Sequence, residues 1–502
     1  MAVHNDLAWK ETEEGRWERN IDEAEQFYTT LARKFGGTGR TFFAMTAHVS
    51  FSVPLEGRNS FDQVVTALRS AWLQLRYDHP TIASWVEYDT KSNRCKKVYN
   101  ALPHGDNLHR QTWVDDTFKI VTNGQTGKEW CNSDPPVPKL PTLFLLTRPV
   151  SNDNYEADIV LRSQHDIIDG IGSLHLLNNL FKYASLFLEN PAAASVEFCC
   201  EWKNLSPPMR VAASIPNSLE PQQQIRLEEI YKRNSSLRQG VEIATVPFKR
   251  GSVIPERHQR VELTLNLEES SQILKAAKNS GASVTHVYHA AIALVLRDLQ
   301  ERRRDERKVR YISYSLINER PLCQEPFNSP HHAASVYHSV SGLSLAIDLD
   351  VPSSTGEQTP ITSAVRKNEF IDILEQVKKY YLTIRNDKEH IVLAPSYWAH
   401  ATPDYPTGAT MPPVPAPNEE PSISISSLGV VDKILSSKHG AFNLESPWVT
   451  GEELGTGLGL FLGTFRGRLC LSAAYNDAWH DESGVMKVLR DCNELVVHGL
   501  GL

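Results

Sequence analysis

A proline-punctuated stretch, residues 191–256, separates two long segments that carry regular helix and strand patterns. Proline removes a backbone donor and interrupts helices and sheets, and one polar helix near residues 222–234 is expected between the prolines. The prolines are Pro191, Pro207, Pro208, Pro216, Pro221, Pro247 and Pro255. We interpret this stretch as a crossover linker. It predicts an N-terminal half over residues 1–190 and a C-terminal half over residues 257–502.

The bulk composition is that of a folded protein with a large interior. The chain has 502 residues, of which 41% are hydrophobic and 22% are charged. It is therefore too long for a single ordinary core and suits two large units. The formal net charge of -8 gives no basic footprint for nucleic acid, so nucleic-acid binding is not expected.

The cysteines and the N-terminal residues indicate a reducing compartment. There are 7 cysteines, an odd count, and no CxxC pair, which disfavours a disulfide framework or a zinc module. The first residues lack the charged and apolar regions of a signal peptide, and no apolar run approaches the roughly 20 residues that span a bilayer. We expect a cytoplasmic protein with no membrane span and no metal centre.

Helix and strand patterns follow one another in an irregular order. Residues 60–78 have a helical period, residues 155–164 have a strand pattern, and residues 172–189 are again helical. In the second half, residues 335–349 are predicted as one strand, and the proline-rich residues 403–421 as a loop. Strands beside packed helices, without a regular βαβ series, predict a mixed α/β (α+β) fold.

The segment His165–Gly170, with the sequence HDIIDG, follows the predicted strand 155–164. A neutral imidazole at the end of a strand can point into a cleft and take a proton from an alcohol. Gly170 and Gly172 let the backbone turn tightly or let a ligand approach. Asp169 can orient the loop through a buried ion pair, because a buried carboxylate needs a partner. The segment is a candidate general-base site.

Less specific interpretations of this segment also fit its residues. A loop histidine followed by a solvated aspartate would also match, and HxxxDG is short enough to occur by chance. Metal binding by His165 and Asp169 lacks a third ligand at suitable spacing. The glycine-rich residues 455–459 lack the Lys-Ser/Thr of a P-loop, and no GxSxG elbow occurs. The context of strand, histidine and helix favours catalysis.

The motif resembles the active-site HxxxDG of the CoA-dependent acyltransferase superfamily. That superfamily includes chloramphenicol acetyltransferase, the plant BAHD acyltransferases and peptide-synthetase condensation domains. His79-Pro80 is similar to its early His-Pro pair, and residues 15–25 are similar to fungal secondary-metabolite O-acetyltransferases of the trichothecene 15-O-acetyltransferase type. Gln164 stands where condensation domains usually carry a second histidine, which disfavours that branch. The plant-type Asp-Phe-Gly-Trp-Gly segment is not found.

Two segments of the second half also resemble the superfamily. Asn318-Glu319-Arg320-Pro321 is similar to its Asn-x-Arg segment, which implies Arg320 as the ion-pair partner of Asp169. The segment Ser426–Gly429, with the sequence SSLG, is similar to the small polar segment that lines the channel. The oxyanion and channel candidates that it supplies are Ser426, Ser427 and Gly429.

The resemblance implies two pseudo-symmetric chloramphenicol-acetyltransferase-like domains around a central channel. Acetyl-CoA or another acyl-CoA would be the co-substrate, and a hydroxylated small molecule would be the acceptor, with no bound cofactor. His165 would deprotonate the hydroxyl, while Asp169 would be structural. A monomer is expected.

Two alternatives stay open at this point. On the same fold, the chain could condense or cyclise a thioester bound to a carrier protein. It could also be a non-catalytic binding member, since a fold alone does not establish activity. The intact His165 and Gly170 speak against the second alternative.

Overall fold

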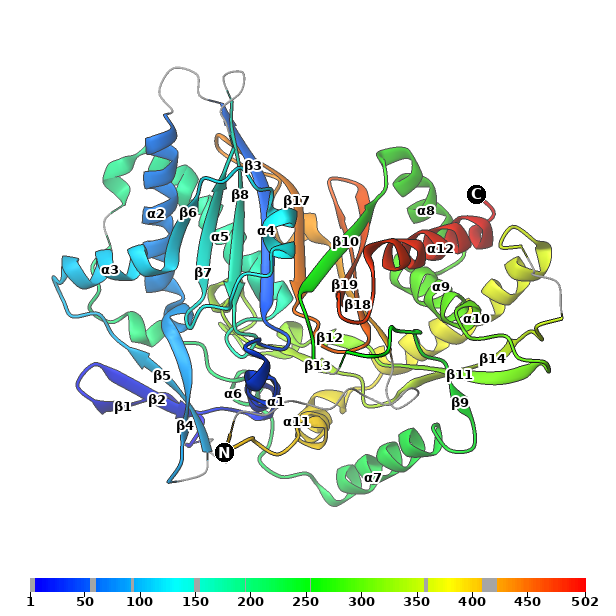
Figure 1. Cartoon of the computed structure of the whole chain (residues 1–502). Helices are drawn as coiled ribbons and strands as arrows, with labels where there is room; N and C mark the ends of the chain where they lie inside the picture. The colour runs from blue at the N-terminus through cyan, green and yellow to red at the C-terminus, as the bar shows by residue number, and fades with distance from the viewer. Residues whose placement is uncertain are drawn as a thin grey trace.

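The computed structural model describes residues 5–54, 60–91, 94–148, 154–194, 196–252, 254–355, 360–408 and 422–502. These residues form two lobes, each with a mixed sheet and helices packed beside it (Figure 1). The mixed α/β class expected from the sequence is confirmed. Residues 409–421 of the predicted proline-rich loop lie outside the described residues. No helix in the described part has the length and apolar character that crossing a membrane requires.

The first lobe is built on a six-stranded sheet with the order β16-β17-β3-β8-β7-β6. In that order the strands are Lys438–His439, Phe442–Gly451, Met45–Pro54, Asn154–Ser163, Thr142–Thr147 and Phe118–Val121. Helices α2 (Phe61–Asp78) and α5 (Gly170–Glu189) pack on each other and on the sheet, where Trp72 and Leu180 are fully buried. The hydroxyl of Ser60 accepts from the Gln63 N–H, and this cap starts α2 at the predicted position.

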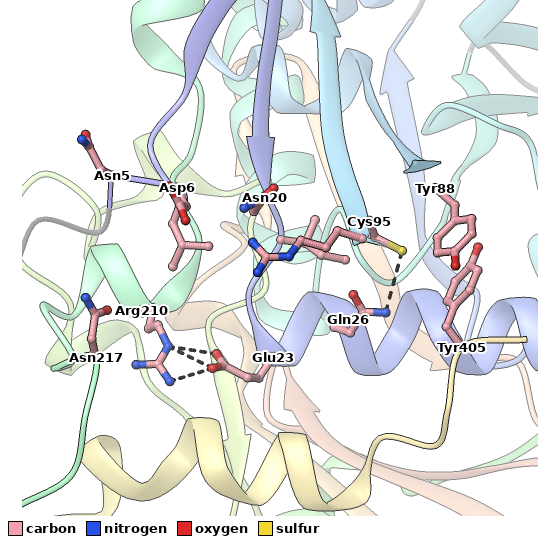
Figure 2. Close-up of a pocket in the computed structure, with 13 residues that line it drawn as sticks. Asn5, Asp6, Asn20, Glu23, Gln26, Tyr88, Cys95, Arg210, Asn217 and Tyr405 are labelled. Carbon is pink, nitrogen blue, oxygen red and sulfur yellow. Dashed lines mark hydrogen bonds and ion pairs between the residues drawn. The ribbon is translucent and has the colours of Figure 1, made fainter. Parts of the chain in front are cut away.

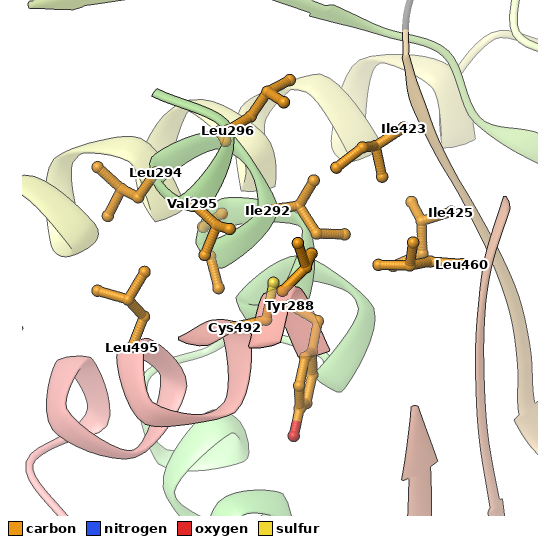
Figure 3. Packing of buried hydrophobic residues seen from close by; sticks show 14 of the residues in the cluster. Tyr288, Ile292, Leu294, Val295, Leu296, Ile423, Ile425, Leu460, Cys492 and Leu495 are labelled. Carbon is orange, nitrogen blue, oxygen red and sulfur yellow. The ribbon is translucent and has the colours of Figure 1, made fainter. Parts of the chain in front are cut away.

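The second lobe is built on a four-stranded sheet with the order β10-β19-β18-β15. In that order the strands are His258–Thr264, Arg468–Asn476, Leu458–Phe465 and Ile423–Val430. Its helices are α8 (Leu267–Asn279), α9 (Val284–Asp298), α10 (Ala364–Arg385) and α12 (Glu482–Leu500). The apolar α9 lies at the centre, with Ile292 toward Ile425 and Leu460 of the sheet (Figure 3).

Smaller elements surround the two lobes. One sheet, with the order β1-β2-β5-β4, consists of Lys10–Glu13, Arg16–Asn20, Arg94–Asn100 and Ser84–Asp89. A second pairs β14 (Leu345–Val351), β11 (Arg307–Ser313) and β9 (Glu242–Ile243), and a third pairs β12 (Leu316–Asn318) with β13 (His338–Val340). The remaining helices are α1 (Glu23–Lys34), α3 (Asn107–Thr117), α4 (Gly127–Asn132), α6 (Met209–Ala212), α7 (Pro221–Ser236) and α11 (His390–Ala401).

The predicted C-terminal half contributes β16 and β17 to the six-stranded sheet of the first lobe. Strand β17, from the predicted C-terminal half, pairs antiparallel with β3 and extends the sheet of the first lobe (Figure 1). The predicted linker is also built into the fold: β9 pairs with β11, and the Tyr231 hydroxyl of α7 donates to the Ser396 carbonyl of α11. The boundaries at residues 190 and 257 therefore remain predictions about chain segments, because the sheets do not follow them.

Two local differences from the expected elements have physical causes. The stretch 335–349 forms two strands, β13 and β14, with a turn between them at Gly342. A Cβ on Gly342 would lie 2.2 Å from the Tyr397 hydroxyl, so the chain turns there directly against α11. Helix α11 contains Pro395, a residue that a pattern-based prediction treats as a breaker.

Candidate active site

His165 lies in the loop between β8 and α5. Its ring stacks face to face on the ring of Tyr28 from α1, with centroids 3.7 Å apart and planes 10° apart. The ring of His338 from β13 lies 5.5 Å away. The His165 residue is partly exposed, its Nδ1 atom is buried, and the plane of its imidazole is fixed by a neighbouring ring.

The His165 ring is neutral across the ordinary pH range. Loss of solvent around the ring lowers its pKa from 6.5 to about 3, and the neighbouring His338 adds to the lowering. The backbone of His165 itself and the Asp169 carboxylate act in the opposite direction. A general base must be unprotonated before it takes a proton, and His165 meets that condition.

Asp169 is the N-cap of α5, and its carboxylate accepts hydrogen bonds on both oxygens. Oδ1 accepts from the Gly172 N–H at 2.7 Å. Oδ2 accepts from Arg320 Nη1 at 2.8 Å and from the Tyr337 N–H at 2.9 Å. Burial alone would raise the pKa of Asp169, but the Arg320 guanidinium and His338 hold it well below its usual range. The ionised carboxylate thus anchors the loop that carries His165.

Arg320 follows β12 and reaches the same loop from the other segment of the chain. The Asp169 and Arg320 side chains are only 4% and 5% exposed. Arg320 Nη2 also donates to the hydroxyl of Ser335 at 3.2 Å, and its backbone N–H donates to Asn318 Oδ1 at 3.2 Å. The structure therefore brings Asp169 and Arg320 together in a buried pair, with the exposed Asn318 hydrogen-bonded at its edge.

Gly172, and not Gly170, is the position that excludes a side chain. A Cβ on Gly172 would lie 2.2 Å from the Ala333 carbonyl oxygen and 2.8 Å from Arg320 Nη2. A Cβ on Gly170 would meet Val449 Cγ2 at 3.4 Å, which is an ordinary contact. The close approach of the segment before β13 to the first turn of α5 requires glycine at position 172.

Ser426, Ser427 and Gly429 lie near the end of β15. The side chain of Leu428, between them, would touch a Cβ on Gly170 at 3.9 Å, so this end of β15 lies beside the His165 loop. The Ser427 hydroxyl lies 2.8 Å from the Thr285 hydroxyl at the start of α9, and is engaged there instead of with His165. Gly429, with φ of 69°, follows a bulge in the pairing of β15 with β18.

Sequence reasoning missed two residues beside His165, namely Tyr28 and His338. The Tyr28 hydroxyl lies 2.7 Å from His338 Nε2, and His338 Nδ1 lies 3.7 Å from Asp169 Oδ2. In the sequence, Tyr28 is one of several residues on the apolar face of a helix, and His338 lies within a predicted strand. Neither belongs to a motif, so residue type was the only available signal.

A buried charge cluster holds the His165 loop on its other side. Lys97 of β5 donates to the backbone carbonyl of Asp166 and to Glu25. Arg19 pairs with Glu25 at 2.7 Å, and the Thr29 hydroxyl donates to the Asp166 carboxylate at 2.8 Å. Burial would raise the pKa of Glu25, but Arg19 and Lys97 lower it to about 2. The residue next to His165 is therefore fixed by both its backbone and its side chain.

A cavity of about 640 Å³ lies beside α1 (Figure 2). Glu23 pairs with Arg210 in its wall, and Gln26 Nε2 lies 3.8 Å from Cys95 Sγ. None of the predicted site residues belongs to the described residues that line it. The cavity is therefore distinct from the surroundings of His165.

Comparisons with known proteins bear on the fold and the activity of the chain. No family model matches the chain. O-acetyltransferase pigM of Monascus ruber is 26% identical over 495 residues, which cover 96% of this chain and 85% of that protein. Acetyltransferase pigO of the same organism is 22% identical and covers 99% of both proteins.

The solved structure of another protein identifies the fold of this chain. Trichothecene 15-O-acetyltransferase from Fusarium sporotrichioides matches with a TM-score of 0.78 at 19% identity, over 99% of this chain and 98% of that chain. Its fold is that of the CoA-dependent acyltransferases, and the resemblance read from the HDIIDG motif is confirmed. The chain is therefore an acyltransferase with the CoA-dependent acyltransferase fold, and its relatives are fungal secondary-metabolite acetyltransferases.

Proposed function

We propose that the chain transfers an acyl group, in the first instance acetyl, from acyl-CoA to a hydroxyl of a fungal secondary metabolite. The observation that carries the proposal is the arrangement at His165: a neutral imidazole, stacked on Tyr28, in a loop anchored by the Asp169–Arg320 pair. The names of the relatives pigM and pigO, both acetyltransferases, support acetyl as the group transferred.

In the proposed reaction, His165 takes the proton of the acceptor hydroxyl while the hydroxyl oxygen attacks the thioester carbonyl. A C–O bond forms, and the carbonyl electron pair moves onto oxygen. Collapse of this tetrahedral oxyanion re-forms the carbonyl and breaks the C–S bond. The CoA thiolate then takes the proton from the His165 imidazolium, which returns the ring to its neutral state.

The oxyanion requires nearby donors, and the end of β15 supports Ser426, Ser427 and the Gly429 N–H as candidates. Loss of one such donor typically costs about 2.7–4 kcal/mol of barrier. Ser426→Ala and Ser427→Ala therefore distinguish the candidates. The serine that serves the oxyanion loses roughly 100- to 1000-fold in kcat on substitution, with little change in KM.

The test of the function uses the full chain, acetyl-CoA and a panel of alcohols. Acceptor-dependent release of the CoA thiol and the mass of the acetyl ester are measured. His165→Ala should abolish both while its unfolding midpoint stays that of the wild type. His331→Ala, at an exposed histidine, is the matched control and should keep full activity.

Two outcomes would redirect the proposal. An active His165→Ala variant would reject His165 as the general base. Transfer from an acyl-loaded carrier protein, with no transfer from acetyl-CoA, would favour the condensation alternative.

A further inference from the structure

The rings of His338 and Tyr28 lie one after the other between Asp169 and His165. The Tyr28 hydroxyl lies 2.7 Å from His338 Nε2, and His338 Nδ1 lies 3.7 Å from Asp169 Oδ2. The centroids of the stacked Tyr28 and His165 rings lie 3.7 Å apart. Helix α1, strand β13 and the loop before α5 thus meet at one imidazole.

The neighbours of these rings determine which of their atoms carry protons. Arg320 keeps Asp169 ionised, so the carboxylate can only accept hydrogen bonds. His338 Nδ1 lies 3.7 Å from Asp169 Oδ2, beyond hydrogen-bond distance, and the negative carboxylate favours the tautomer with its N–H on Nδ1 and its lone pair on Nε2. Burial holds the pKa of Tyr28 well above its usual range, so the phenol keeps its proton and donates it to His338 Nε2.

This direction of hydrogen bonding has a consequence for His165. Because the Tyr28 hydroxyl is bound, its ring cannot slide along the imidazole without losing a hydrogen bond in a buried place. The ring also presents its π face to an imidazole that becomes positively charged on taking a proton, and such a face attracts a cation. Precise placement matters, since a 1 Å displacement of a catalytic group can lower the rate about 100-fold.

We propose that His338 is a positioning residue for acyl transfer, which holds the Tyr28 hydroxyl and thereby fixes the ring on which His165 is stacked. His338 fixes the position of His165 through Tyr28, disfavours the protonated imidazole as its direct neighbour, and does not touch the reacting atoms. The proposal rests on the function proposed above, with His165 as the general base. It adds a residue of the C-terminal half to the support of a base in the N-terminal half.

The test is a double-mutant cycle in the full chain. Tyr28→Phe removes the hydroxyl and keeps the stacked ring, whereas His338→Gln removes the imidazole that receives the hydroxyl. With acetyl-CoA and the best alcohol of the panel, we expect each variant to lose about tenfold in kcat with little change in KM for acetyl-CoA. The double variant should lose no more than either single variant, because both changes break one contact.

A pH profile separates positioning from a loss of folding. The titratable groups that face His165 are Tyr28 from α1, His338 from β13 and Asp169 from its own loop. His338→Gln removes a neighbour that disfavours the protonated ring, so the acid limb of kcat/KM should move upward. A merely structural substitution would lower the whole profile and leave its limb in place.

Each outcome decides the proposal. The proposal is overturned if the losses in kcat of the two single variants multiply in the double variant. It is also overturned if the acid limb of kcat/KM does not move in His338→Gln. If the His338 variant does not fold, Tyr28→Phe remains informative because it deletes a single oxygen atom, and a wild-type kcat there overturns the proposal. An inactive His165→Ala beside a fully active Tyr28→Phe rejects this inference alone, whereas an active His165→Ala rejects the proposed function with it.

Discussion

Asp169 and Arg320 lie 151 positions apart in the chain and form a buried ion pair of 2.8 Å. Asp169 caps the helix that follows the His165 loop, and Arg320 follows a strand of the other segment. A buried pair adds little stability relative to apolar side chains, but removing one partner leaves an uncompensated charge. The pair therefore fixes the contact between the loop that carries His165, the proposed general base, and the chain segment that carries Arg320.

Breaking this pair should destabilise the fold strongly. Asp169→Asn keeps a residue that can cap α5 but leaves the Arg320 charge unpaired, so we expect a loss of about 3–5 kcal/mol in the free energy of unfolding. Urea denaturation measures it. Lys487→Ala, in the exposed i,i+4 pair with Asp491, is the control and should lose about 0.5 kcal/mol or less. A loss of under about 1 kcal/mol for Asp169→Asn would show that the pair does not anchor the loop.

The two glycines of the site should respond differently to alanine. Gly172→Ala drives a Cβ against a backbone carbonyl at 2.2 Å, and overpacking of this kind costs about 1–3 kcal/mol. Gly170→Ala meets its nearest atom at 3.4 Å and should change the free energy of unfolding by about 0.5 kcal/mol or less. The same denaturation experiment compares them. Equal losses would mean that the segment before β13 can move away from α5.

The acid limb of activity should lie well below the pKa of a free histidine. His165 is neutral because burial lowers its pKa from 6.5 to about 3, and kcat/KM reports the ionisation of the free enzyme. We expect kcat/KM for acetyl-CoA to stay flat from about pH 7 down to about pH 5. A limb at pH 6.5 would show that His165 titrates as a solvated residue.

The stability of the fold should decrease in mild acid. Burial lowers the pKa of His79, His258 and His289 from 6.5 to about 3. Between pH 6.5 and about pH 3 the unfolded chain binds more protons than the folded chain. The contribution of these histidines to the free energy of unfolding is therefore fully present above pH 6.5 and is lost as the pH drops toward 3. Each histidine contributes up to about 1.4 kcal/mol per pH unit. Urea unfolding at several pH values measures the slope, and His258→Gln should reduce it. A free energy of unfolding that is constant over this range would contradict buried neutral imidazoles.

The elements that the sequence predicts well are those in which several local signals agree. Helix α2 has an apolar period, a capping serine at Ser60 and a His-Pro pair after its last residue, and together these signals predict its bounds almost to the residue. Strand β8 and helix α5 were recognised in the same way. Helix α11 was not predicted, because Pro395 contradicts its pattern and the surrounding packing overrides that local preference.

The residues of the candidate site also differ in whether local signals in the sequence can predict them. His165 and Asp169 share one short motif, so their proximity is a property of the local chain. Arg320 was predicted through the family resemblance. Tyr28 and His338 reach His165 only because α1 packs on α11, where the Phe27 and Trp398 rings lie 4.9 Å apart, and beside β13. Contacts of this kind depend on tertiary packing, which periodicity and spacing do not encode.

The pairing of β17 with β3 has a consequence for how the protein is made. Until β17 arrives, β3 is an edge strand with unpaired N–H and C=O groups, which invite pairing with other chains. During synthesis, the sheet of the first lobe therefore stays open until residue 451 has left the ribosome. The lobe that is translated first is therefore completed late. Its open β3 edge is the place where a nascent chain needs protection from pairing with other chains.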